Sequence, residues 1–140
     1  MTTHWQDAAR AALAGSEADT MPFPQGVQLL IEAGFDGYAA DFRRSVRTYY
    51  RPDGETFELK TAPTPMPVAE RFDAAVVKQA IREAQALVPG YTYKGFCAKV
   101  AAAGCAGYMV SFPGRRVLYY GRTAETHTEL FPDAQPEPKP

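Results

Sequence analysis

The chain has 140 residues and a formal net charge of −1, with 46% hydrophobic and 22% charged residues. This balance is ordinary for a folded domain and excludes wholesale disorder or collagen-like character. The low net charge argues against a partner held by bulk electrostatics, such as nucleic acid or an anionic membrane. No apolar run approaches the roughly 18 residues of a membrane span, so we expect no membrane association.

The N-terminal residues lack a basic region followed by an apolar core, so the sequence predicts no secretion signal. Its two cysteines, Cys97 and Cys105, are too few for a disulfide framework and form no CxxC motif. Together these features predict a cytoplasmic protein.

Two helices are predicted at the start of the chain. The first begins at Thr3, which forms a capping box with Gln6, and ends at Gly15. The second is shorter, and Gly34 is expected to take a left-handed conformation after its end. Its apolar face consists of Val27, Leu30 and Ile31.

Three strands are expected next, at about 38–42, 46–51 and 55–60, because apolar and polar residues alternate there with period two. A proline-rich linker over 61–69 follows. The same order of elements then recurs. A helix capped by Asp73 ends before Pro89 and Gly90, and a second helix precedes Gly104. Further strands are predicted at about 108–112, 116–121 and 125–130, the first two joined by a type II turn at Pro113-Gly114.

An internal duplication explains this recurrence. Shifted by 70 positions, residues 33–56 match residues 103–126 at 9 of 24 positions, against roughly one or two expected by chance. We therefore predict an α+β fold built by duplication of a helix-helix-three-strand unit about a pseudo-two-fold axis. Antiparallel sheet, in one piece or two, is covered by the helices. Residues 1–131 form one compact domain with repeats at about 1–60 and 70–131, and residues 132–140 form a disordered tail.

The segment over residues 96–132 also carries a family resemblance. Its features are Ala-Gly-Cys ahead of Gly107-Tyr108, the Pro113-Gly114 turn, the run Tyr-Tyr-Gly-Arg at 119–122, and Glu-Thr-His at 125–127 ahead of Phe-Pro. This pattern resembles the bacterial domain-of-unknown-function family 1398, whose members are often labelled phage envelope-like proteins. The resemblance extends over roughly 110 residues. It implies no activity, cofactor or catalytic residue.

Tyrosines and arginines interleave on the predicted strands of both repeats. Such side chains can hold a small anion through bidentate contacts or stack nucleic-acid bases. The acidic balance and the lack of a complete RNA-binding signature disfavour nucleic acid. The alternative is structural: the tyrosines pack under the helices and the arginine stems cover sheet edges. The candidates for lining a cleft between the repeats are Tyr38, Tyr49, Tyr108, Tyr119, Arg116 and Arg122.

The last predicted strand places Glu125, His127 and Glu129 on one face, because side chains two apart on a strand point the same way. Two carboxylates and an imidazole are suited to a divalent metal or to acid–base chemistry. The first repeat has Phe57 and Leu59 at the positions of His127 and Glu129. A one-residue insertion would remove this correspondence. The alternative is a solvated edge strand whose charges oppose aggregation.

A nucleophilic Cys105 with His127 as its base is a further hypothesis, set against two buried, inert thiols. The leading interpretation is a non-enzymatic module without a cofactor, which holds a small anionic ligand or a protein partner in the cleft between the repeats. The alternative is a small metal-binding protein or enzyme that uses Glu125, His127 and Glu129. Homodimerisation through an exposed sheet edge is also considered.

Overall fold

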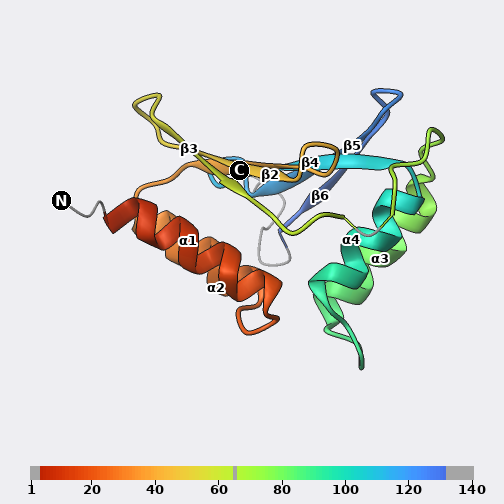
Figure 1. Ribbon diagram of the computed structural model, residues 1–140, viewed down its shortest axis with the longest axis horizontal. Helices are drawn as coiled ribbons and strands as arrows, with labels where there is room; N and C mark the ends of the chain where they lie inside the picture. Colours follow the sequence, from red (N-terminus) through yellow and green to blue (C-terminus); the bar gives the residue numbers. More distant parts are fainter. Residues whose placement is uncertain (1–3, 65, 132–140) are drawn as a thin grey trace, which may run out of the picture.

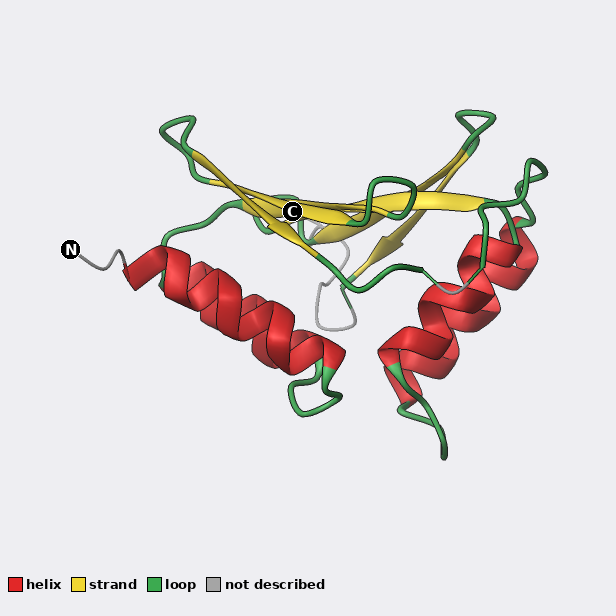
Figure 2. Cartoon of the chain, in the orientation of Figure 1, coloured by secondary structure: helices red, strands yellow, loops and turns green. Residues whose placement is uncertain are grey.

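The computed structural model describes residues 4–64 and 66–131, and within them four helices cover one face of an antiparallel sheet (Figures 1 and 2). The fold class is therefore α+β, as predicted. The Thr3 cap and the predicted tail at 132–140 lie outside the described residues. In chain order the elements are α1 (His4–Glu17), α2 (Phe23–Glu32), β1 (Gly37–Asp41), β2 (Val46–Tyr50), β3 (Thr56–Lys60), α3 (Ala74–Ala86), α4 (Tyr93–Ala102), β4 (Cys105–Ser111), β5 (Arg116–Gly121) and β6 (Thr126–Leu130).

The strands form one continuous sheet in the order β3-β2-β1-β4-β5-β6. Strands β1 and β4 make the seam between the two halves, with Ala39 opposite Met109 at its centre. At one end of the seam Gly37 pairs with Ser111, and at the other end Asp41 pairs with Gly107. A shift of 70 residues turns Gly37 into Gly107 and Asp41 into Ser111, so the two pairs correspond. The pairing is thus unchanged when each residue is exchanged for its counterpart. This symmetry supports the duplication hypothesis, which stays a prediction.

Glycines allow the close approach of backbone along this seam. A Cβ atom on Gly37 would lie 2.4 Å from the carbonyl oxygen of Val110. A Cβ atom on Gly107 would lie 2.3 Å from that of Ala40. Real Cβ atoms do not approach carbonyl oxygens so closely, so both positions of the seam require glycine.

The helices pack in two pairs, α1 with α2 and α3 with α4 (Figure 1). The core lies between these pairs and the sheet, and Leu30, Val77 and Val100 bring almost fully buried side chains into it from the helices. The Asp73 cap of α3 is confirmed, because its carboxylate accepts a hydrogen bond from the Val76 N–H at 3.2 Å. Burial of such apolar faces supplies most of the stability of short helices.

The predicted end of α1 at Gly15 is wrong, because the helix continues to Glu17. Gly15 serves tertiary packing instead. A Cβ atom there would lie 2.6 Å from the Cβ of Met21, where the chain turns back toward α2. The glycine therefore makes room for the return of the chain.

The predicted type II turn at Pro113-Gly114 is also wrong. A type II turn needs a positive φ at Gly114, but the positive value falls on Arg115, at 51°. The Ser111 hydroxyl accepts a hydrogen bond from the Gly114 N–H at 2.9 Å, and the Arg115 N–H donates to the Phe112 carbonyl at 3.2 Å. Ser45, the counterpart of Arg115, also has a positive φ, of 55°.

Candidate functional site

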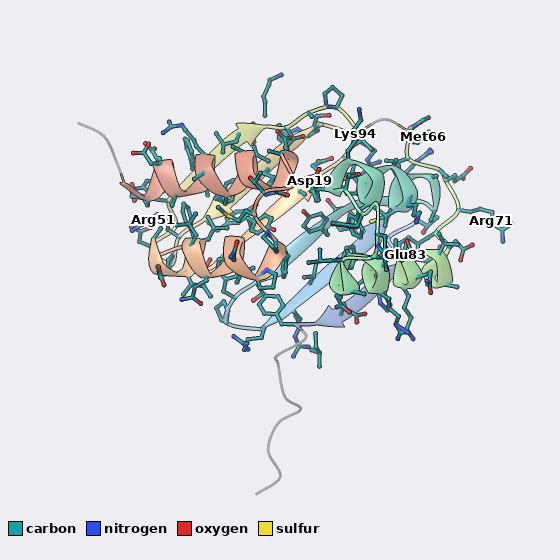
Figure 3. The ribbon with its side chains drawn as sticks, turned by 90° about the horizontal axis from the view of Figure 1, so that it is seen from below. Asp19, Arg51, Met66, Arg71, Glu83 and Lys94 are labelled. Carbon is teal, nitrogen blue, oxygen red and sulfur yellow. The ribbon has the colours of Figure 1, made fainter. Side chains whose placement is uncertain are left out.

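A cavity of about 530 Å³ opens between the two helix pairs, with the sheet as its floor. Figure 3 looks onto the helical layer and shows strands between the α1–α2 pair and the α3–α4 pair. Side chains from both halves of the chain line this cavity, and most of them are apolar. They include Val27 and Leu30 of α2, Ile81 and Ala84 of α3, Phe96 of α4 and Val117 of β5.

Arg47 lies in the floor of the cavity and is only 3% exposed. Among the described residues no carboxylate lies within ion-pair distance of its guanidinium. Its hydrogen bonds are long: Nη1 donates to Tyr49 Oη at 3.4 Å, and Nη2 donates to Ser16 Oγ at 3.4 Å and to Tyr108 Oη at 3.3 Å. Its buried Nε has no hydrogen-bond partner in the described part of the chain. Typical N–H···O distances are nearer 2.9 Å, so these donors are weakly satisfied.

Aromatic rings surround the guanidinium. Its central carbon lies 4.9 Å from the ring centre of Tyr38 and 5.2 Å from that of Tyr93. The hydroxyl groups of Tyr93 and Tyr108 are hydrogen-bonded at 2.7 Å. Ring faces attract a cation, but they leave its full charge without a counter-ion.

The charge states in this cluster follow from the pKa values. Burial acts to lower the pKa of Arg47, while the surrounding tyrosines raise it, and the net shift is well upward. The guanidinium is therefore charged at physiological pH. Burial also raises the pKa of Tyr38, Tyr93 and Tyr108, so their hydroxyls stay neutral. The site thus offers one positive charge and several neutral hydroxyl groups, which suits an anion.

Three of the tyrosines named from the sequence, Tyr38, Tyr108 and Tyr119, line this cavity. Tyr49 is fully buried and contacts Arg47 through its hydroxyl. Arg116 and Arg122 lie outside the cavity lining and are exposed. Their side chains donate to backbone carbonyls, of Gly114 at 3.0 Å and of Val68 at 3.3 Å respectively.

Arg47 is one of the arginines that interleave with the tyrosines, but Arg116 and Arg122, not Arg47, were predicted to line the cleft. Arg47 lies two residues before Tyr49 on β2, so both point toward the helices. Its counterpart in the second half is the apolar Val117. A charge in one half of the chain, at a position that is apolar in the other half, was the signal that could have identified Arg47.

On β6, His127 pairs with Tyr119 and Glu129 pairs with Val117. Phe57 and Leu59 make the corresponding pairs in the first half, with Tyr49 and Arg47. The correspondence over 70 residues therefore holds here, and the one-residue insertion considered above is wrong.

His127 and Glu129 are half-buried, and His127 Nε2 lies 3.0 Å from Glu129 Oε1. Glu125 is exposed in the preceding turn, where its carboxylate accepts a hydrogen bond from the Thr123 hydroxyl at 2.6 Å. In the described ranges no group of three or more His, Cys, Asp or Glu side chains could share a metal ion. The structure thus brings two of the three proposed ligands together, and metal binding stays a prediction.

Cys97 and Cys105 are both buried. Burial raises the pKa of each thiol to about 11, and Cys105 Sγ donates to the Gly107 carbonyl at 3.2 Å. A thiol that stays protonated at neutral pH is a poor nucleophile, which argues against catalysis by Cys105 with His127.

The native thiols are expected to react with a disulfide reagent far more slowly at pH 8 than the unfolded chain does. Because these thiols hold their protons more tightly in the native state, stability is full below the unfolded pKa of about 8.5 and falls as the pH rises toward 11. Urea midpoints measured from pH 7 to about pH 9.5, below the ordinary tyrosine pKa of about 10, will test this fall before the buried tyrosines contribute to it. Equal thiol reactivity in the native and unfolded protein would contradict the burial of both groups.

Asp19 connects the two helix pairs at the rim of the cavity (Figure 3). Its carboxylate accepts a hydrogen bond from the Tyr93 N–H in the first turn of α4, at 2.8 Å. Its own φ is 58°, a left-handed conformation in which Asp and Asn are enriched. One exposed residue thus links the first half of the chain to the helix that carries Tyr93.

Asp19→Ala is expected to lower the free energy of unfolding by about 1–2 kcal/mol, because it removes an acceptor at a helix start and favours other backbone conformations. Asp19→Asn keeps both the acceptor and the left-handed preference, so its cost is expected to stay within about 0.5 kcal/mol. Urea unfolding of the two variants measures the difference. Equal losses would show that the bond to Tyr93 contributes nothing.

The fold and site together define an α+β protein with a buried cation, unpaired within the described part of the chain, in a cavity between two helix pairs. Residues 11–130 match the model of the family described as "Protein of unknown function (DUF1398)", and the chain belongs to this family. The resemblance stated from the sequence is thereby confirmed, although that description mentions neither a phage nor an activity. No curated protein matches the chain. No helix in the described part of the chain is long and apolar enough to cross a membrane.

Proposed function

We propose that this protein is a binding module that holds a small organic anion in the cavity between its helix pairs, with Arg47 as the anchor. The observation that carries the proposal is a charged guanidinium, buried on the floor of an apolar cavity, for which residues 4–64 and 66–131 supply no counter-ion. Burying a charge costs several kcal/mol unless it is paired. A ligand that brings an anion would supply the missing partner.

The size of the cavity and the chemistry of its lining support the proposal. Pockets for small molecules usually measure about 300–1,000 Å³ and combine an apolar lining with a few convergent polar groups. Here the polar groups converge on one point, where Arg47, Tyr108 and Ser16 meet. A guanidinium in such surroundings binds carboxylates and phosphates through short, charge-assisted hydrogen bonds. The two unpaired cysteines fit a protein of the reducing cytoplasm.

A thermal-shift panel of organic carboxylates and phosphates tests the proposal on the wild type, Arg47→Met and Arg116→Met. A ligand at about 100 times its dissociation constant adds roughly 2.7 kcal/mol, which raises the melting temperature by about 5–15 °C. We expect the shift to vanish in Arg47→Met and to persist in Arg116→Met, since Arg116 lies outside the cavity. A shift that persists without Arg47 would refute the anchor. If no compound raised the melting temperature, small-anion binding would be refuted and a protein partner would be favoured.

The second candidate function is metal binding or acid–base catalysis by His127 and Glu129, with Glu125 joining from the preceding turn. The observation in its favour is the 3.0 Å contact between His127 and Glu129 beside the cavity, which Glu129 lines. Titration with Zn²⁺ tests it. A stability gain with Zn²⁺ that disappears in His127→Ala would support metal binding, and an unchanged melting temperature would rule out a Zn²⁺ site at these residues.

A further inference from the structure

We infer that the anion is a monocarboxylate with a long apolar tail, of the fatty-acid class, whose carboxylate binds Arg47 and whose tail crosses the sheet toward β6. This inference rests on the proposed function and specifies its ligand. Three features of the cavity carry it: the balance of its charges, its length, and the side chains at its far end.

The charges favour a single negative charge on the ligand. Among the described residues that line the cavity, Arg47 is the sole cation, whereas Asp19 and Glu129 are acidic. A phosphate or a dicarboxylate would place a second negative charge near these carboxylates with no cation to balance it. A monocarboxylate matches one guanidinium and can accept two parallel hydrogen bonds from it.

The cavity extends across the sheet from Arg47. On the helix side, Arg47 of β2 lies opposite Ala40 of β1, which lies opposite Tyr108 of β4. Tyr108 lies opposite Tyr119 of β5, next to β6, where Glu129 and Leu130 still line the cavity. Neighbouring strands are about 4.8 Å apart, so the four steps from β2 to β6 span roughly 19 Å. A compact anion bound at Arg47 would occupy one end of this length.

Apolar side chains continue along the route and remain exposed at its end. Ile81 and Ala84 of α3 and Val117 of β5 follow the tyrosines. Four large apolar side chains that line the cavity have unusually high exposed fractions. They are 41% for Phe23, 56% for Leu87, 36% for Val88 and 43% for Leu130. Apolar groups gathered around a groove mark a binding surface, and an alkyl tail would cover them.

Calorimetric titration with saturated carboxylates from hexanoate to tetradecanoate, each below its micelle concentration, tests the inference. Each added methylene is expected to tighten binding about fourfold until the tail reaches the mouth of the cavity. Methyl esters of the same chains lack the charge and are expected to bind at least 30-fold more weakly than the acids. The acids are likewise expected to bind Arg47→Met at least 30-fold more weakly than they bind the wild type. Benzoate and naphthoate serve as compact anions.

Ala84→Phe is designed to fill the middle of the route and leave the Arg47 end open. We expect this variant to bind hexanoate like the wild type but to lose the gain from longer chains. Ala86→Phe is the matched control, because Ala86 is exposed on the same helix and does not line the cavity. It is expected to preserve the full dependence on chain length.

The outcomes separate this inference from the proposed function. Binding of benzoate or naphthoate that needs Arg47, with no gain from longer chains, would overturn the long-tail inference and leave the anion site standing. Esters that bind as tightly as acids would overturn both the claim that the ligand binds through a carboxylate and the claim that Arg47 anchors it. Failure of every anion to bind would overturn the proposed function itself. An Ala84→Phe variant that keeps the chain-length gain would overturn the route toward β6.

Discussion

Arg47→Met is expected to raise the free energy of unfolding of the ligand-free protein by about 1–2 kcal/mol. Burying a charge costs several kcal/mol, and replacing buried ionic groups by apolar ones of similar volume is often stabilising. The two ring contacts of Arg47, each worth about 1 kcal/mol, oppose this gain but do not cancel it. Methionine fills a similar volume and adapts to irregular spaces.

Urea unfolding at pH 7, without added ligand, measures this gain. Arg116→Met is the control. Because Arg116 is exposed, the free energy of unfolding of this variant is expected to stay within about 0.5 kcal/mol of that of the wild type. A gain in stability combined with a loss of anion binding is the signature of a residue kept for a ligand. If Arg47→Met instead lost more than about 1 kcal/mol, the guanidinium would be a structural support for the tyrosines.

Gly104→Ala is expected to be the most damaging small substitution in the chain, with a loss of about 4–5 kcal/mol or failure to fold. Gly104 has a φ of 93°, and a Cβ atom there would lie 1.9 Å from the carbonyl oxygen of Arg71. The backbone beside this contact is fixed, because the Asp73 N–H donates to the Ala103 carbonyl at 2.7 Å. To avoid the clash, the segment around Arg71 that leads into α3 would have to move away from Gly104, which directly precedes β4.

Gly34→Ala is the matched control, since Gly34 is the counterpart of Gly104 and has a φ of 95°. The nearest atoms to its Cβ would belong to the guanidinium of Arg51, at 3.3 Å, and the end of a long side chain can move. The expected loss is the backbone strain alone, about 1–2 kcal/mol. Urea unfolding of both variants compares them. Similar losses would show that the contact with Arg71 does not restrict this position.

The elements were largely predictable because their signals are local. Period-two alternation located the described strands, although β4 begins at Cys105 rather than at about 108, and helical spacing with the Asp73 cap located α3. The turn was mispredicted because Ser111 supplies a side-chain acceptor, which shifts the positive φ from Gly114 to Arg115. The end of α1 was mispredicted because Gly15 is needed for contact with Met21 rather than to stop a helix.

The candidate site was predictable only in part. The tyrosines follow from strand alternation, and the same rule excludes Arg116, which lies on the opposite face of β5 from Tyr119. Strand alternation places Arg47 on the same face of β2 as Tyr49, but it does not by itself predict that a charged side chain there is buried. That burial depends on Tyr93 of α4 and Tyr108 of β4, which come from the other half of the chain. The tertiary packing of the two halves, rather than the pattern of either one, therefore creates the site.

The strand order has a consequence for folding kinetics. In the described sheet every pair except β1–β4 joins consecutive strands through a short turn, so each half can form its own meander quickly. The entropy cost of long-range closure is concentrated in the β1–β4 seam. Arg47 and Tyr108 lie on opposite sides of that seam, so the proposed anion site can form only after the seam has closed. A bound anion would hold the seam shut, and it should lower the unfolding rate more than it changes the folding rate.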